Sequence, residues 1–285
     1  MKKVVVLGST GMAGHIIAEY MGQKGFDVYR VSRSERNTEK SRGIDVINID
    51  KLLIYLDEVC PDVVINCIGL LQKGCEEHPD AAVLINAYLP HCLENHYQNS
   101  NTKIIHLSTD CVFSGERGNY NENDLRDGAS FYDRSKALGE ICNTKDLTFR
   151  MSIIGPDIDE NGTGLFNWFM KQNGTIKGYS KAIWNGVTTL ELAEAIVAAI
   201  DENLCGLYHL VPEESINKYD LLKLFQKTFG KTNVIIEREE QVVLDKSLVN
   251  NRTDFSYKVK SYPVQIEYMK KWIEANKDLY PLYYN

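Results

Sequence analysis

The stretch SFYDRSKALGE places two side chains that could exchange a proton four residues apart, the phenol of Tyr132 and the ammonium of Lys136. On a helix, residues at positions i and i+4 lie on one face, so both groups would face the same space. A nearby ammonium stabilises a phenolate and is expected to lower the pKa of the phenol. Such a tyrosine could give and take a proton near neutral pH. Because this spacing is common by chance, the pair becomes informative only in its context.

The context begins with the strand-like stretch KIIHLSTD, which ends in three polar residues, Ser108, Thr109 and Asp110. A hydroxyl at the carboxyl end of a central parallel strand would lie in the crevice where open α/β sheets bind ligands. The Thr109 hydroxyl could therefore hold a substrate oxygen beside the phenol. Together with a nicotinamide, these side chains would suit interconversion of a carbonyl and an alcohol. By itself, Thr109 would be an ordinary cap at the end of a strand.

A glycine-rich loop follows the first apolar run of the chain, with Gly8, Gly11 and Gly14 spaced by three residues in GSTGMAG. Glycines let the backbone approach a pyrophosphate closely, and the N-terminus of the next helix adds free N–H groups and partial positive charge. This position between a strand and a helix predicts nucleotide binding. The alternative is a purely structural turn.

The segment after the second strand bears on the choice of dinucleotide. NAD-preferring loops often carry an acidic residue there, but this chain has Ser32 and Arg33. Arg33 could pair with a 2′-phosphate, which favours NADPH and leaves NADH possible. A solvated arginine is the alternative. Asp50 could accept a hydrogen bond from the adenine amino group, or could be the N-cap of the following helix.

Strand-like and helix-like segments alternate from residue 1 to about residue 211, which predicts an α/β protein with a Rossmann-type, doubly wound parallel sheet. Two stretches interrupt the alternation, and we expect them to form a smaller substrate-binding lobe facing the strand ends. The dinucleotide-binding domain would comprise residues 1–154 and 187–211, and the lobe residues 155–186 and 212–285. Inside the long helical segment that follows the third strand, Pro90 predicts a kink or a break.

Composition narrows the classes of function. The chain has 285 residues, 44% of them hydrophobic and 25% charged, as in ordinary soluble globular proteins. A net charge of −7 argues against general nucleic-acid binding, and no apolar run approaches the ~20 residues of a membrane span. The seven cysteines include no CxxC pair and suggest reduced thiols in a cytoplasmic protein. No histidines have metal-ligand spacing, so no metal is predicted.

Taken in order, these motifs resemble the extended short-chain dehydrogenase/reductases, and within them the dTDP-4-dehydrorhamnose reductase type. The resemblance covers most of the chain and rests on LGSTGMAGH, PDVVINCIGL, LSTDCVFSGERGNYNEND, YDRSKALGE and FRMSIIG. It implies NADPH-dependent reduction, with NADH possible, of the 4-keto group of a nucleotide-activated 6-deoxysugar. The product would be a precursor of a surface polysaccharide, and a homodimer is an expected assembly.

The resemblance also implies roles for individual residues. Thr109 would bind the 4-keto oxygen, Tyr132 would protonate it, and Lys136 would bind the nicotinamide ribose and tune Tyr132. The implied cofactor-binding set adds the loop residues and the residues along the nicotinamide: Gly8, Thr10, Gly11, Met12, Gly14, Cys67, Ile68, Gly69 and Ser108. Contacts to the base, sugar or diphosphate could come from Asp110, Trp168, Trp184 and Arg252, although the aromatic residues could equally fill the core of the lobe.

The chain also departs from the rhamnose-type pattern, because the loop after the third strand reads GLLQKGCEEHP. The sugar and the nucleotide therefore stay open, and N-acetylated 6-deoxy-4-ketohexoses on UDP are as plausible as the dTDP sugar. An epimerase or dehydratase with bound NAD is one alternative, although Cys111 stands where dehydratases usually complete an acid pair after the threonine. A non-catalytic regulatory subunit on the same fold is the other.

Overall fold

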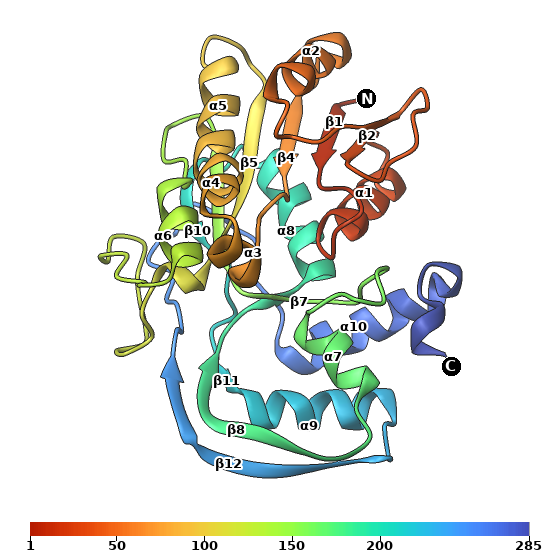
Figure 1. Cartoon of the computed structure of the whole chain (residues 1–285), viewed down its shortest axis with the longest axis vertical. Helices are drawn as coiled ribbons and strands as arrows, with labels where there is room; N and C mark the ends of the chain where they lie inside the picture. Colours follow the sequence, from red (N-terminus) through yellow and green to blue (C-terminus); the bar gives the residue numbers. More distant parts are fainter. Residues whose placement is uncertain (285) are drawn as a thin grey trace.

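The computed structural model describes residues 1–284, and within them seven parallel strands form a central sheet in the order β10-β6-β5-β4-β1-β2-β3 (Figure 1). The strands are β1 (Lys3–Leu7), β2 (Asp27–Ser32), β3 (Ser41–Gly43), β4 (Val63–Asn66), β5 (Lys103–Thr109), β6 (Leu147–Met151) and β10 (Gly206–His209). The strand order reverses between β1 and β4, which is the switch point of a doubly wound sheet. The predicted fold class is confirmed.

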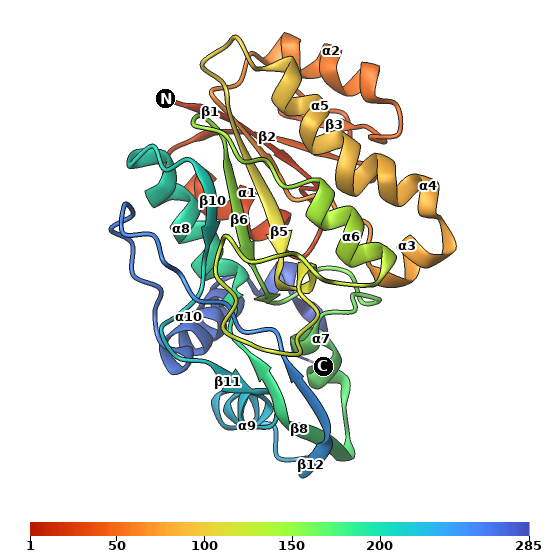
Figure 2. The same cartoon turned by 90° about the vertical axis from the view of Figure 1, so that its left-hand side faces the viewer.

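Helices cover both faces of this sheet (Figure 2). On one face lie α1 (Gly14–Gln23) and α8 (Thr189–Asp201), and on the other α2 (Ile49–Val59), α5 (Leu89–His96) and α6 (Phe131–Leu138). Successive side chains of a strand point to opposite faces, so Val4 and Val6 belong to one hydrophobic core and Val5 and Leu7 to the other. Burial on both faces explains why β1 is an uninterrupted apolar run.

The helical segment around Pro90 stays helical, although its geometry changes. After α3 (Gln72–Glu77), the chain passes through α4 (Pro79–Ala82) and the π-helical turn η1 (Val83–Tyr88) into α5. The N–H of Leu89 bonds to the carbonyl of Leu84, five residues back. Proline has no N–H to donate, and the turn just before Pro90 is wider than an α-helical turn. The helical run does not break at Pro90.

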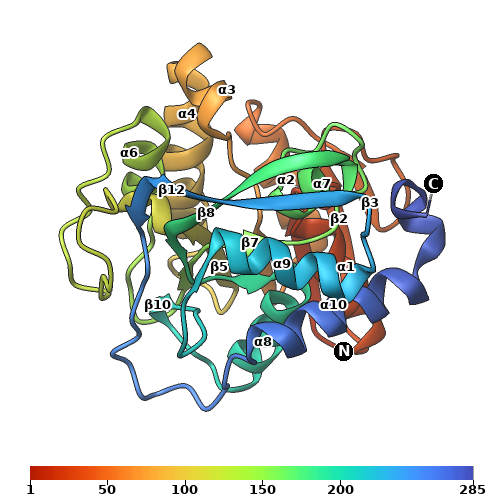
Figure 3. The same ribbon diagram turned by 90° about the horizontal axis from the view of Figure 1, so that it is seen from below.

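A second sheet forms the smaller lobe, which lies beyond the carboxyl ends of the central strands (Figures 1 and 3). Among the described residues it has three strands: β8 (Gly174–Trp184) lies between β12 (Val234–Asp245), which is parallel to it, and β11 (Ile216–Asn217). Helix α9 (Lys218–Phe229) packs on β8, and helix α7 (Leu165–Lys171) directly precedes β8 in the chain. The strands β7 (Ile153–Ile154) and β9 (Val187–Thr188) pair where the chain leaves and re-enters the larger domain. The division at 154/155 and 186/187 follows these connections and stays a proposal.

The C-terminal segment contacts both parts of the molecule. Helix α10 (Tyr262–Ala275) packs against α8 and α9 and is followed by the short 3₁₀ helices η3 (Lys277–Leu279) and η4 (Pro281–Tyr283). In Figure 3 this end of the chain runs alongside α1. Residues predicted to belong only to the lobe therefore also reach the predicted nucleotide-binding domain. No helix among residues 1–284 is both long enough and apolar enough to cross a membrane.

Candidate active site

The segments predicted to bind a dinucleotide all follow the carboxyl ends of neighbouring strands. Gly8 follows β1, Arg33 follows β2, residues 67–69 follow β4, and β5 ends at Thr109. These strands are adjacent in the sheet, so the four segments share one edge. Ligands of open α/β sheets bind at this edge, outside the switch point.

The glycine loop has a backbone that other residues could not adopt. Gly8 has a φ of +79°, and a Cβ there would lie 3.2 Å from the carbonyl carbon of Cys67 and 3.1 Å from the side chain of Ile68. A Cβ on Gly14 would lie 2.1 Å from the carbonyl oxygen of Gly8. Two of the three glycines are therefore required by the close approach of α1, β1 and the segment after β4.

The same loop offers donors for an anion. Within residues 1–284, the N–H groups of Thr10, Met12 and Ala13 make no hydrogen bond. They stand at the N-terminus of α1, where the helix dipole favours negative charge. The Thr10 hydroxyl donates to Ser32 Oγ at 3.0 Å, which ties the loop to the end of β2. Three free N–H groups at a glycine-lined helix start fit a pyrophosphate.

Beyond Ser32, the region expected to contact the adenosine contains one residue that sequence reasoning missed. Arg33 is exposed, and so is Asp50 in the first turn of α2. Asp50 is not the N-cap of that helix, because Asn48 accepts the Lys51 N–H at 3.1 Å. The missed residue is Glu35, whose carboxylate accepts the Ser9 hydroxyl at 2.8 Å. In VSRSER, attention to the two arginines as phosphate ligands left this carboxylate unconsidered.

Tyr132 and Thr109 come together at the start of α6. Ser130 and Asp133 form a capping box, with Ser130 Oγ accepting the Asp133 N–H at 3.1 Å and Asp133 Oδ2 accepting the Ser130 N–H at 3.2 Å. This cap holds Tyr132 in the first helical turn. The Thr109 hydroxyl donates to Asp110 Oδ1 at 3.1 Å, and it lies near enough to the Tyr132 phenol to influence the pKa of that group.

The electrostatics of Tyr132 differ from the expectation. Burial raises the pKa of the phenol, and the neighbouring Cys111 and Asp110 raise it further, while the nearby Thr109 hydroxyl lowers it. The predicted lowering by Lys136 is therefore wrong for the protein alone, because removal from water outweighs the other influences. The phenol therefore keeps its proton at neutral pH, as an ordinary tyrosine does, and burial makes it harder to ionise.

Lys136 is buried in the core, at 4% exposure. Its Nζ donates to the Leu107 carbonyl at 2.7 Å and lies 3.4 Å from Nε2 of His106, whose other ring nitrogen is 3.2 Å from Asn66 Nδ2. Burial lowers the pKa of the ammonium to about 8, against the attraction of Glu140. His106 is buried and contacts Lys136. Nothing in the spacing of the sequence indicated that contact.

Ser108 belongs to a buried polar network. Its hydroxyl donates to Glu140 Oε1 at 2.7 Å, and Arg150 binds both oxygens of Glu140 at 2.7 and 2.6 Å. The Ser108 hydroxyl therefore points into the protein interior. This orientation does not support the contact with the cofactor that was implied for it. The network joins the end of β5 to β6 and to the segment just after α6, so it braces the elements that carry Thr109 and Tyr132.

The residues predicted to contact the substrate do not all gather at this edge. Asp110 is buried beside Thr109, and Trp168 on α7 is 39% exposed. Trp184 is only 6% exposed, donates to Ser152 Oγ at 2.8 Å and packs on Tyr262, so it fills the core of the lobe.

Arg252 also lies elsewhere. Its guanidinium bonds to Asp254 and to the carbonyls of Cys205 and Leu207, at the start of β10. Arg252 therefore lies near the amino ends of the parallel strands, whereas Thr109 lies at their carboxyl ends. The positions of Trp184 and Arg252 do not support the substrate contacts predicted for them. The local sequence around each residue did not show where its side chain packs.

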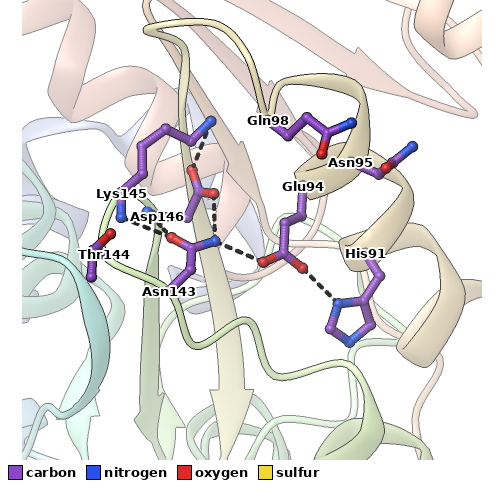
Figure 4. A pocket seen from close by; sticks show the side chains of 8 residues that line it. All are labelled: His91, Glu94, Asn95, Gln98, Asn143, Thr144, Lys145 and Asp146. Carbon is purple, nitrogen blue, oxygen red and sulfur yellow. Dashed lines mark hydrogen bonds and ion pairs between the residues drawn. The ribbon is translucent and has the colours of Figure 1, made fainter.

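The pocket in Figure 4 is not the candidate site. It has a volume of about 410 Å³ and lies between α5 and the segment that leads into β6, at the amino end of the sheet. Several of its polar groups are paired with one another: Asn143 Nδ2 donates to Glu94 Oε1 at 2.7 Å, and His91 Nδ1 is 2.8 Å from the other oxygen of Glu94.

Comparisons with known proteins agree with this geometry. The chain is 25% identical over 260 residues, 87% of each chain, to a probable low-salt glycan biosynthesis reductase of Haloferax volcanii. It is 20% identical to methionine adenosyltransferase 2 subunit beta of Bos taurus, over 77% of this chain and 70% of that one. A dTDP-4-dehydrorhamnose reductase of Bacillus anthracis, solved in complex with NADP, superposes with a TM-score of 0.81 at 21% identity, over 97% of this chain and 100% of that one. The sequence model of the RmlD substrate binding domain matches residues 1–246, and the chain belongs to that family.

Proposed function

We propose that this chain is an NADPH-dependent reductase of the 4-keto group of a nucleotide-activated 6-deoxysugar, working in the synthesis of a surface polysaccharide precursor. The observation that carries the proposal is the meeting of Thr109 and Tyr132 at the carboxyl end of β5, beside a glycine loop with free N–H groups. The family and the names of its relatives support the same class of reaction.

The residues of the site divide the work. The Thr109 hydroxyl would hold the keto oxygen of the sugar, and the phenol of Tyr132 would give that oxygen its proton. The phenol of Tyr132, like that of an ordinary tyrosine, carries its proton at neutral pH, which is the state that reduction of the keto group requires. Lys136 would hold the ribose next to the nicotinamide with the part of its ammonium that Leu107 and His106 leave free. A bound reduced nicotinamide would supply the hydride.

NADPH is the preferred dinucleotide in this proposal, and NADH is a possible substitute. The exposed Arg33 could pair with a 2′-phosphate, which NADH lacks. Glu35 lies close by, on the hydroxyl of Ser9, and would repel a phosphate or accept a ribose hydroxyl instead. The preference therefore depends on which of the two side chains faces the ribose, and measured KM values for both dinucleotides would decide it.

The experiment that tests the proposal is a substrate panel. The purified protein is incubated with NADPH and with 4-keto-6-deoxyhexoses carried on dTDP, UDP or GDP, and loss of nicotinamide absorbance is followed. We expect turnover with at least one sugar, and the panel also identifies the nucleotide. Tightly copurified NAD, with no consumption of added NADPH, would favour an epimerase or dehydratase instead.

A second candidate function is that of a non-catalytic subunit. It is favoured by the similarity to a protein that is named as a subunit of another enzyme, methionine adenosyltransferase. The retention of Thr109, Tyr132 and Lys136 argues against it, because a binding subunit does not need a proton donor at the strand end. A protein that binds NADPH but turns over no sugar of the panel would favour this second candidate.

A further inference from the structure

The family model ends at residue 246, yet the chain that follows returns to the glycine loop. Tyr280, between η3 and η4, is completely buried, and its hydroxyl lies 2.8 Å from Nε2 of His15 on α1. The indole N–H of Trp272 on α10 donates to the same hydroxyl at 3.0 Å. A segment outside the matched region thus contacts the first helix of the nucleotide-binding domain at a residue one position after Gly14.

The direction of these bonds follows from the number of hydrogens available. The Tyr280 hydroxyl accepts from Trp272, whose indole nitrogen can only donate, so its own hydrogen is free to go to Nε2 of His15. A neutral histidine that accepts at Nε2 carries its hydrogen on Nδ1, and Nδ1 lies 2.8 Å from the carbonyl oxygen of Gly11. Burial lowers the pKa of His15, which is consistent with a neutral ring.

The carbonyl of Gly11 is therefore held twice, by the ring of His15 and by the backbone N–H of the same residue at 3.1 Å. A peptide group is planar and trans, so its C=O and N–H point in opposite directions. Holding the Gly11 carbonyl toward α1 directs the N–H of Met12 the other way. That N–H is one of the three free donors at the start of the helix.

A second contact ties the same end of the chain to the neighbouring segment. The Tyr283 hydroxyl accepts the N–H of Asp157 at 2.8 Å. Asp157 begins a segment that ends at Gly164, where a Cβ would lie 2.9 Å from the sulfur of Met12. The C-terminal segment therefore also holds the start of the stretch that contacts the Met12 side chain.

We propose that the C-terminal segment positions the pyrophosphate-binding N–H groups of the glycine loop through a hydrogen-bonded relay from Trp272 through Tyr280 and His15 to Gly11. Tyr280 and His15 are positioning residues in this arrangement, because they act through the Gly11–Met12 peptide. The inference rests on the proposed function only in requiring that a dinucleotide binds at this loop.

The test compares two buried tyrosines of the C-terminal segment. Tyr280→Phe removes the hydroxyl of the relay and keeps the ring. Tyr262→Phe is the matched control, since its hydroxyl lies 3.5 Å from the carbonyl of Trp184 in the lobe. We expect the Kd for NADPH, measured by nicotinamide fluorescence, to rise about tenfold in Tyr280→Phe, as for loss of an ordered hydrogen bond. Tyr262→Phe should leave it within about twofold.

If the Tyr280 hydroxyl had a purely structural role, Tyr280→Phe would lower the melting temperature but would not weaken NADPH binding more than the other kinetic constants. We therefore expect Tyr280→Phe to keep the wild-type kcat and sugar KM once NADPH is saturating. His15→Gln approaches the relay from the α1 side and serves if Tyr280→Phe does not fold. Both substitutions combined should weaken NADPH binding by less than the product of their separate effects, since they interrupt one pathway.

The outcomes separate the two proposals. Equal NADPH affinity in Tyr280→Phe, His15→Gln and the Tyr262→Phe control, with a wild-type protein that binds NADPH, would overturn the relay and leave the proposed function standing. A folded wild-type protein that binds neither NADPH nor NADH would remove the proposed function, and the relay with it.

Discussion

The two halves of the candidate site work by different means. At the glycine loop the available groups are backbone N–H donors, and the side chains matter mainly by being absent at Gly8 and Gly14. At the start of α6 the available groups are ionisable side chains, and burial determines their protonation. We infer that substitutions at the loop change dinucleotide affinity, whereas those at α6 change the rate and its pH dependence.

Replacement of Tyr132 tests the α6 half and should have the largest effect. Tyr132→Phe removes the only proposed proton donor to the sugar oxygen, so we expect kcat to fall by about 10²–10⁴-fold. The Kd for NADPH should change little, because the phenol donates nothing to the glycine loop. Steady-state rates and fluorescence titration measure the two quantities. An unchanged kcat would exclude Tyr132 from the mechanism.

Replacement of Gly14 tests the loop half. A Cβ there would lie 2.1 Å from the carbonyl oxygen of Gly8, so in Gly14→Ala the loop must move and the Kd for NADPH should rise at least about 30-fold, equivalent to ~2 kcal/mol. Gly22→Ala is the matched control on the same helix, because a Cβ at Gly22 meets nothing within 4 Å. The control should bind NADPH normally and gain up to ~1 kcal/mol of stability from helix propensity. Similar NADPH affinities in both variants would contradict a required glycine at position 14.

The pH dependence of the rate separates the two ionisable groups. The pKa of Lys136 is lowered to about 8 and that of Tyr132 is raised, so as pH rises the ammonium is the first of the two to lose its proton. We expect kcat/KM to decline above about pH 8, by up to about tenfold per pH unit. In Lys136→Arg, whatever activity remains should lose this decline, since a guanidinium stays charged. A flat wild-type profile to pH 10 would argue against a required ammonium.

The smallest expected effect concerns the choice of dinucleotide. Arg33→Ala should raise the KM for NADPH by about fivefold to twentyfold and leave that for NADH nearly unchanged, because only NADPH carries a 2′-phosphate for the guanidinium to bind. In the opposite sense, Glu35→Gln should improve NADPH binding modestly by removing a neighbouring negative charge. Equal changes for both dinucleotides in Arg33→Ala would place Arg33 away from the 2′-phosphate.

Much of the fold and part of the site could be predicted because they depend on short-range patterns. The alternation of apolar strands and amphipathic helices predicted the parallel sheet, and GSTGMAG after β1 predicted the loop. The i, i+4 spacing placed Tyr132 and Lys136 on one helix. Arg252 and Trp184 could not be placed in this way, because an arginine or a tryptophan has the same local pattern whether it contacts a ligand or packs elsewhere.

The amino-acid sequence alone determined the order of strands and helices, the glycine positions and the i, i+4 spacing of Tyr132 and Lys136, since each follows from periodicity or residue type within a few positions. Only the tertiary structure decided the direction of the pKa shift of Tyr132 and the return of Tyr280 to His15. The pKa shift of Tyr132 depends on burial, and burial results from several segments, far apart in the chain, that together exclude water from the phenol. The contact from residue 280 to residue 15 depends on how α10 packs across the whole molecule, which no local pattern encodes.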